Sequence, residues 1–290
     1  MDYGRLLDAH VDEDADITVA ALPVTPEDAT SMGLFLFDRS GTIAGFEEKP
    51  SPERLAQLGG SVPAGTIFYN QTHEERTPFI ASMGIYVFSR NVLLDLVENT
   101  AGTDFGREII PASLQNYKVK AFLHHSYWAD VGTVESFYDA NIMLTQPDSP
   151  FSFYDPRRPI FTHERYLPPS HFRACTIRES IVADGCYLEE CAVDQSLIGI
   201  RTRVGPGTRI TRSVLLGADL YDLDPENPAL GVGSDVVLDR VIIDKNASIG
   251  DGARIVNAAN LQHADGDGYV IRNGIVIIPK GGHIAAGTTI

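Results

Sequence analysis

The chain has 290 residues, of which 43% are hydrophobic and 21% charged, and this composition is typical of a soluble globular protein with room for two domains. Its formal net charge of -16 argues against nucleic acid and anionic membranes as partners, because both require a broad positive field. No apolar run approaches the roughly 20 residues of a membrane helix, and no secretory signal is visible. Cys175, Cys186 and Cys191 form no paired motif, so we expect buried thiols, not a zinc site or a disulfide framework.

The N-terminal half alternates short β-branched runs with stretches of helical periodicity, as α/β domains do. Buried strands are expected at 17–22 and 80–88, and a further strand at 119–123. Ser89 is placed to begin a helix whose apolar positions share one face. Another helix is expected at 134–144, directly after a polar loop.

A cluster of prolines marks the predicted domain boundary. Six prolines lie between Pro147 and Pro169, a density that sustains neither a helix nor a central strand. We therefore predict an α/β domain at 1–146, a linker at 147–175 and a second domain at 176–290.

Aliphatic residues in the predicted second domain recur every six positions. The expected rungs are Ile198, Val204, Ile210, Leu216, Val237, Ile243, Ile249, Ile255, Ile278, Ile284 and Ile290. Glycine or another small residue follows several of them, which suits the corners of a triangular coil of short parallel strands. We expect a left-handed parallel β-helix of the hexapeptide type, interrupted by a polar excursion at 219–229.

Three segments of the α/β half carry polar residues at positions that suit a ligand site. Glu48 and Lys49 emerge where a proline ends a strand, and they can hold sugar hydroxyls and a phosphate. Ser82 and Gly84 interrupt an apolar strand, where a hydroxyl needs a partner and glycine permits close backbone approach. Asp130 lies between a strand and a helix, where it either holds a hard cation or caps the helix.

In their order and spacing, these segments resemble the glucose-1-phosphate adenylyltransferase family, also called ADP-glucose pyrophosphorylases. The resemblance covers essentially the whole chain. Its main motifs are Glu-Lys-Pro at 48–50, Ser-Met-Gly-Ile-Tyr-Val-Phe at 82–88, Asp-Phe-Gly at 104–106 and Trp-Ala-Asp-Val-Gly-Thr at 128–133. Each motif is weak alone, but together they are specific.

The resemblance implies a partial Rossmann-like nucleotidyltransferase domain followed by the β-helix. The implied reaction forms ADP-glucose and pyrophosphate from ATP and glucose 1-phosphate, in glycogen or starch synthesis. Asp130 would hold Mg²⁺, and with Lys49 it would be catalytic. The residues implied to bind glucose 1-phosphate are Gly33, Glu48, Lys49, Ser82 and Asp104. The protein would chiefly position two anions and neutralise their charge, without a covalent nucleophile.

The sequence departs from the family's pattern at its start. Family members place a glycine-rich ATP loop and a second metal-binding aspartate before a Met-Asp-Tyr segment, which here is residues 1–3. Without these parts we expect the polypeptide alone to be inactive or nearly so. A start codon assigned too late, a sequenced fragment and a degenerate paralogue all fit this pattern.

The resemblance also implies regulation and assembly. Lys280 matches a lysine that binds the anionic activator 3-phosphoglycerate in plant and cyanobacterial relatives, whereas Ala258 replaces a second activator lysine. Arg165 is a candidate anion ligand near the domain junction. A homotetramer or heterotetramer is implied, in the cytoplasm of a bacterium or the plastid of a plant.

Two other interpretations remain open at this stage. An inactive regulatory or structural subunit of the same assembly would also lack the ATP loop. A hexapeptide-repeat acyltransferase would use His263 or His283 as its base, but it would leave the N-terminal motifs unexplained.

Overall fold

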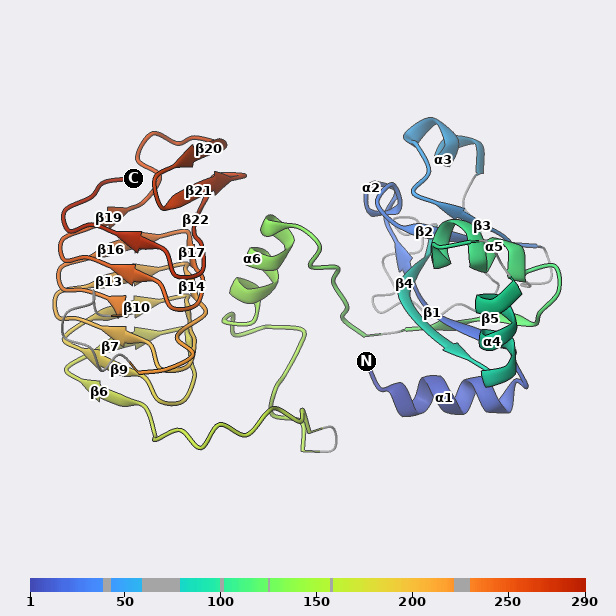
Figure 1. Cartoon of the computed structure of the whole chain (residues 1–290), viewed down its shortest axis with the longest axis horizontal. Helices are drawn as coiled ribbons and strands as arrows, with labels where there is room; N and C mark the ends of the chain where they lie inside the picture. The colour runs from blue at the N-terminus through green and yellow to red at the C-terminus, as the bar shows by residue number, and fades with distance from the viewer. Residues whose placement is uncertain (39–42, 59–78, 100–101, 125, 157–158, 222–229) are drawn as a thin grey trace. The chain divides into compact units, whose positions relative to one another are not determined.

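The computed structural model describes residues 1–38, 43–58, 79–99, 102–124, 126–156, 159–221 and 230–290. It contains two compact units, Met1–Trp128 and Ala129–Ile290, which are described separately (Figure 1). Among the described residues, no helix is both long and apolar enough to span a bilayer.

The described residues of the first unit form a mixed five-stranded sheet with helices, which confirms the predicted α/β class. The strand order is β3-β2-β4-β1-β5, and β1 and β5 run parallel while the other described neighbours are antiparallel. The strands are β1 (Ile17–Val24), β2 (Gly33–Phe37), β3 (Ile43–Glu48), β4 (Phe79–Phe88) and β5 (Val119–Leu123). The helices are α1 (Tyr3–Asp12), α2 (Pro26–Ala29), α3 (Pro52–Leu58), α4 (Arg90–Asn99), the π-helix η1 (Phe105–Ile109) and α5 (Ile110–Ser113).

The predicted strands and helix around Ser89 are confirmed, and a buried histidine links them to α1. The His10 ring lies 2.8 Å from the Thr18 hydroxyl and 3.3 Å from the Ser89 hydroxyl. Ser89 precedes α4, as predicted, and its hydroxyl donates to the Ala15 carbonyl. These bonds satisfy polar groups in the interior, where an unpaired one would be costly.

Ser82 and Gly84 lie at a break in the pairing of β4 with β1. The register between β1 and β4 changes between Val19, which pairs with Tyr86, and Ala21, which pairs with Ser82. Gly84 lies in this stretch with a positive φ of 69°, a conformation that glycine adopts without strain. Its backbone N–H donates to the Ser82 hydroxyl over 3.1 Å. The polar residues in this otherwise apolar strand therefore belong to a bulge.

The second unit begins with α6 (Val134–Met143), which packs on the β-helix that follows. Tyr138 is buried, contacts the apolar cluster that contains Val214 and Ile275, and donates its hydroxyl to the Arg212 carbonyl over 2.6 Å. The compact units divide after Trp128, and the predicted domain bounds of 1–146, 147–175 and 176–290 stay a prediction. Between α6 and the first strand of the β-helix, the described residues form neither helix nor strand.

Stacked coils of short parallel strands follow from residue 171 onward (Figure 1). One sheet contains β6 (His171–Arg173), β9 (Tyr187–Glu189), β12 (Arg203–Val204), β15 (Gly231–Val232), β18 (Ser248–Ile249) and β23 (His283–Ile284). The second contains β7 (Thr176–Arg178), β10 (Ala192–Asp194), β13 (Arg209–Thr211), β16 (Val237–Asp239) and β19 (Arg254–Ile255). The third contains β8 (Ile181–Val182), β11 (Leu197–Ile198), β14 (Val214–Leu215), β17 (Val241–Ile243), β22 (Ile275–Ile278) and the antiparallel hairpin β20 (His263–Gly266) and β21 (Tyr269–Arg272). Most of the predicted polar excursion, 222–229, lies outside the described residues.

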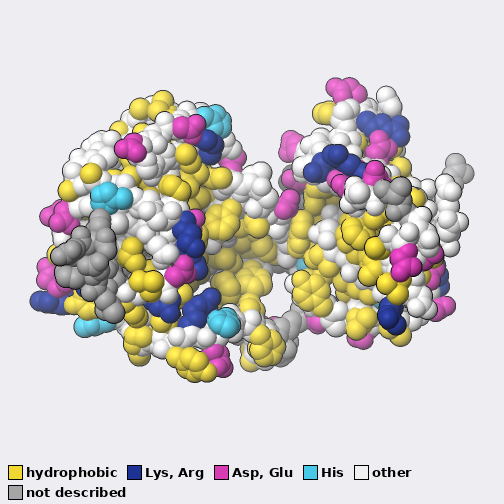
Figure 2. Space-filling model, in the orientation of Figure 1, with side chains coloured by type: hydrophobic (Ala, Val, Ile, Leu, Met, Phe, Trp, Pro, Cys, Tyr) yellow, Lys and Arg dark blue, Asp and Glu magenta, His cyan; other side chains and the backbone are white. Residues whose placement is uncertain are grey.

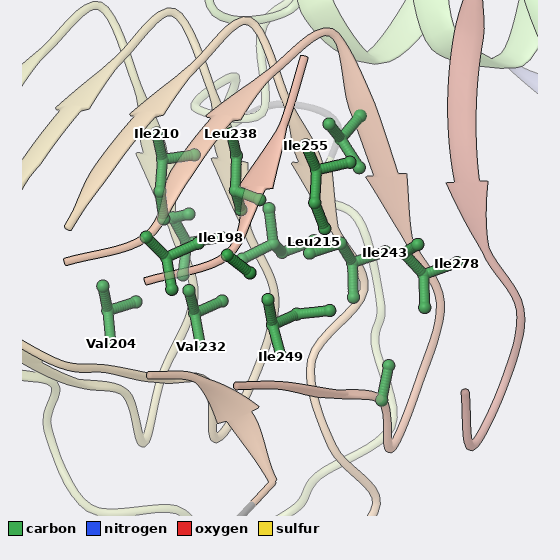
Figure 3. Close-up of a cluster of buried hydrophobic side chains, with 14 of the residues drawn as sticks. Ile198, Val204, Ile210, Leu215, Val232, Leu238, Ile243, Ile249, Ile255 and Ile278 are labelled. Atoms are coloured by element: carbon green, nitrogen blue, oxygen red, sulfur yellow. The ribbon is translucent and has the colours of Figure 1, made fainter. Parts of the chain in front are cut away.

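The inward-facing aliphatic residues fill the coils, but two predicted rungs are wrong by one position (Figure 3). Leu215 and Leu238 are buried in this core, whereas Leu216 and Val237 are half-buried outside it. The predicted six-residue period fails at one corner of the coil, where Leu215 lies five positions after Ile210 and Ile243 lies five positions after Leu238.

A corner of the coil explains the shorter repeat. Between the second and third sheets, the buried Ser196 and Ser213 hydroxyls accept backbone N–H groups from the next coil, at 3.0 and 3.2 Å. Gln195 and Arg212 turn this corner with left-handed φ values of 48° and 43°. Only Arg212 and Ser213 separate β13 from β14, whereas four residues separate β12 from β13, so the rung after Ile210 comes one residue early.

The surface of the β-helix carries ion pairs between successive coils. Arg178 contacts Asp194 at 2.6 Å, and Arg212 contacts Asp239 at 2.6 Å. Figure 2 accordingly shows both acidic and basic side chains on the visible face of each unit. These exposed pairs add little stability individually, and their regular spacing follows from the stacking.

Two glycines at corners provide a test of the coil packing. Both have positive φ, but a Cβ on Gly217 would lie 2.1 Å from the Ile200 carbonyl oxygen, whereas a Cβ on Gly252 would meet nothing within 4 Å. Gly252→Ala should lower the free energy of unfolding of the β-helix by about 1 to 2 kcal/mol through backbone strain alone. Gly217→Ala should lower it by at least about 3 kcal/mol, since overpacking is added. Urea unfolding followed by circular dichroism measures both, and equal losses would contradict the packing.

Candidate functional site

The site in the first unit begins where β2 and β3 pair. Gly33 lies opposite Glu48 in the antiparallel register. A Cβ on Gly33 would lie 2.5 Å from a Glu48 carboxylate oxygen and 2.3 Å from the Phe46 ring. Glycine is therefore required for the Glu48 carboxylate to lie across β2.

Lys49 follows β3 in a strained backbone conformation. Its φ is 48°, in the left-handed region that non-glycine residues rarely adopt, and its N–H donates to the Met32 carbonyl over 3.1 Å. Such outliers persist where the surrounding structure holds them, often at functional sites. The Lys49 ammonium is close enough to Asp104 for its charge to contribute to lowering the pKa of that carboxyl.

Asp104 is held by the turn that precedes the π-helix. Its carboxylate accepts the Arg107 backbone N–H over 2.9 Å, and this bond is the first cause of its lowered pKa. In return, the Glu108 carboxylate accepts the N–H groups of Thr103, over 2.7 Å, and of Asp104, over 3.3 Å. This reciprocal arrangement resembles a capping box and keeps Asp104 ionised at a fixed place.

Gly106 brings the two carboxylates to one location. A Cβ on Gly106 would lie 3.0 Å from a Glu48 oxygen and 3.5 Å from an Asp104 oxygen. Glu48 and Asp104 therefore flank the same bare stretch of backbone. The absence of a side chain there leaves space in front of both acids.

Tyr86 links β4 to these acids. Its side chain is hydrogen-bonded to Ser82, and its ring stacks on Phe105 with centroids 5.8 Å apart. Burial is the main cause that raises the pKa of Tyr86, and the charges of Glu48 and Asp104 raise it further, while the Ser82 bond opposes them. Ser82 and Tyr86 thus belong to the same cluster as the two carboxylates.

The structure therefore brings together five residues that the sequence nominated: Gly33, Glu48, Lys49, Ser82 and Asp104. It adds Tyr86 and Gly106, which were not predicted as site residues although both lie inside the family motifs at 82–88 and 104–106. Two features of the sequence could have pointed to them. Tyr86 carries a hydroxyl in the same strand as Ser82, and Gly106 directly follows Phe105. Carboxylates and hydroxyls suit a polyol, and an ammonium beside them suits a phosphate.

Asp130 belongs to the second unit, and its metal role stays a prediction. Its carboxylate accepts the Gly132 N–H over 3.2 Å. The cap of α6 is Thr133, whose hydroxyl accepts the Ser136 N–H over 3.1 Å, so Asp130 is not the helix cap. Within the described ranges, no three His, Cys, Asp or Glu side chains cluster as a metal site. Asp130 alone fits a single ligand of Mg²⁺, which commonly takes one or two carboxylates plus phosphates and water.

The two predicted effector residues lie in different surroundings of the second unit. The Lys280 ammonium is 3.5 Å from the Asp219 carboxylate, which Lys245 also contacts at 2.8 Å. The hydrogen bond from Lys245 is the main cause that lowers the pKa of Asp219 to about 2, and the charge of Lys280 contributes. Arg165 is exposed and donates to the His163 carbonyl over 3.2 Å.

The two alternative bases of the acyltransferase interpretation lie in different sheets of the β-helix. His263 pairs with Arg272 in the hairpin, and His283 pairs with Ser248 in another sheet. Both side chains are exposed.

Comparison with protein families agrees with this architecture. Residues 1–147 match the family model described as Nucleotidyl transferase. The chain belongs to the nucleotidyl transferase family. Residues 165–289 match the GLGC left-handed parallel beta-helix domain, which also gives the hand of the coil. Together the two matches form the domain architecture of ADP-glucose pyrophosphorylase and fit a sugar nucleotidyltransferase of the GlgC type.

The pKa of Tyr86 tests the site geometry without any ligand. Glu48→Gln removes a nearby negative charge, so the pKa of Tyr86 should fall. Glu27→Gln, an exposed change on α2, should leave it unchanged. NMR titration of ring-labelled tyrosine, assigned with Tyr86→Phe, gives the values. If the pKa of Tyr86 is the same in wild type and in Glu48→Gln, the Glu48 carboxylate does not lie near Tyr86 and the site geometry is wrong.

Proposed function

We propose that the first unit binds glucose 1-phosphate and that the chain serves the formation of ADP-glucose and pyrophosphate from ATP. The observation that carries this proposal is the convergence of two carboxylates, a hydroxyl pair and a lysine around Gly33 and Gly106. The nucleotidyl transferase and GLGC domain matches support the reaction class.

Each group has a task in this proposal. The carboxylates of Glu48 and Asp104 accept hexose hydroxyls, which a neutral amide would hold less strongly. Ser82 and Tyr86 supply further hydroxyls on the β4 side. The Lys49 ammonium binds the phosphate of the sugar and offsets its negative charge. An oxygen of that phosphate then approaches the α-phosphorus of ATP. The protein contributes orientation and charge neutralisation.

Asp130 would provide one carboxylate to Mg²⁺, which when bound supplies charge neutralisation for the phosphates. Glucose 1-phosphate can be offered to the chain without ATP and Mg²⁺. Its binding then reports on the chain's own residues and not on the ion. A binding measurement with glucose 1-phosphate alone is therefore the cleaner test.

Isothermal titration calorimetry with glucose 1-phosphate tests the proposal. Gly33→Ala should weaken binding at least about tenfold, or about 1.4 kcal/mol, because its Cβ would displace the Glu48 carboxylate. Gly45→Ala is the matched control on the neighbouring strand, since its nearest contact is the movable Leu36 side chain at 3.3 Å. Wild-type chain that fails to bind glucose 1-phosphate would overturn the proposal.

We also propose that the second unit mediates assembly into a homotetramer or heterotetramer and responds to anionic metabolites through Lys280 and Arg165. A cytoplasmic or plastid location goes with this proposal. Asp219 then competes with the effector, since its carboxylate contacts both Lys280 and Lys245. The effector must displace or bridge this acid.

Removing the competing acid should strengthen effector binding. Asp219→Asn should tighten the binding of 3-phosphoglycerate by about tenfold, because two ammonium groups lose their counter-charge. Lys280→Ala should weaken it, while Asp267→Asn, on the exposed tip of the hairpin, should change nothing. Calorimetry measures the affinity of all three variants for 3-phosphoglycerate. Unchanged affinity in both Asp219→Asn and Lys280→Ala would exclude Lys280 from the effector site.

A further inference from the structure

Two cysteines lie side by side on the first two coils of the β-helix. The Cys191 thiol lies 3.6 Å from the Cys175 sulfur. They directly precede the paired residues Thr176 and Ala192, and the Thr176 N–H donates to the Cys191 carbonyl over 2.9 Å. The two cysteines therefore occupy equivalent positions on adjacent coils.

This placement fits the geometry of a disulfide. Neighbouring parallel strands are about 4.8 Å apart, and Cα atoms joined by a disulfide are usually about 4.4 to 6.8 Å apart. The sulfurs have to approach from 3.6 Å to about 2.05 Å for the bond to form. No shift of the strand register is required.

The two thiols differ in access. Cys191 is buried, and burial is the main cause that raises its pKa to about 12. Cys175 is only half-buried, which corrects the expectation that all three thiols are buried. The third cysteine, Cys186, is buried elsewhere in the core and its thiol donates to the Gly199 carbonyl over 3.1 Å. Cys175 is thus the accessible member of the pair.

We propose that Cys175 and Cys191 form a redox-sensitive disulfide that staples the first coil of the β-helix to the second. The oxidant is a small-molecule disulfide. The Cys175 thiolate attacks one sulfur of the oxidant, forms a mixed disulfide and releases one thiolate. The Cys191 thiol loses its proton and attacks the Cys175 sulfur, which expels the second thiolate. The protein loses two protons and two electrons, and the oxidant takes them up to become two thiols.

The first coil is where such a bond has an effect. Each of β6, β7 and β8 is the last strand of its sheet and pairs with one described neighbour only. All residues of β6 and β7 are exposed, including Phe172 and Ile177. A coil held from one side opens locally more easily than the inner coils. The disulfide joins it covalently to β10's coil.

Oxidation of the full chain with a glutathione redox buffer tests the proposal. Peptide mapping should find a Cys175–Cys191 linkage, with Cys186 still free. Hydrogen exchange of amides in 171–182 should slow by about tenfold or more on oxidation. Cys186→Ala should retain this response, whereas Cys175→Ala and Cys191→Ala should lose it.

Three outcomes would overturn the inference. They are glutathione attached to Cys175 with no internal bond, a linkage that involves Cys186, and a linkage that leaves exchange in 171–182 unchanged. Wild-type mapping keeps the test decisive if an alanine variant fails to fold. Since none of these readouts uses a sugar or a nucleotide, the result is independent of the proposed function.

Discussion

The contact between the Glu48 carboxylate and the bare backbone of Gly33 is the constraint on which the first unit's site depends. Any side chain at residue 33 would occupy the space of that carboxylate and of the Phe46 ring. With this space open, Glu48 reaches Gly106 and lies near Asp104. The pairing of β2 with β3 thus sets where the two carboxylates come together, at the place where we propose that the sugar binds.

Backbone hydrogen bonds and ring packing around Asp104 also hold the site. Glu108 fixes the turn of Asp104 through two backbone N–H groups, and the π-helix that follows brings Phe105 against Tyr86. Short π-helical segments often occur at functional sites. The bulge in β4 completes the arrangement, because it sets Ser82 beside Tyr86. Three local departures from regular structure therefore converge on one place.

The sequence predicted the elements of both units well and the long-range geometry less well. Strong periodicity and β-branched runs located β1, β4, β5 and α6. Strand pairing that opposes Gly33 to Glu48, and the stacking of Tyr86 on Phe105, depend on residues far apart in the chain. Such contacts leave no local pattern. The motifs nominated Gly33 and Asp104 only through resemblance to a family, and periodicity alone would have missed both.

In the β-helix, the long-range stacking was predicted and the local geometry of one corner was not. The period was visible, but the shortened corner at Ser196 and Ser213 was not, because a buried hydroxyl that accepts a backbone N–H looks like any surface serine in sequence. Two rungs were misplaced as a result. The packing of α6 on the coil was also hidden, since Tyr138 has an ordinary place in an amphipathic helix.

A crystal structure of the chain with glucose 1-phosphate tests the central claim most directly. The account predicts the sugar phosphate in the first unit, with its phosphate at the Lys49 ammonium and hexose hydroxyls on Glu48, Asp104 and Ser82. A ligand bound away from these residues at full occupancy would contradict it. A structure without bound glucose 1-phosphate would also contradict it, if the ligand is saturating and the site around Gly33 and Gly106 is accessible in the crystal.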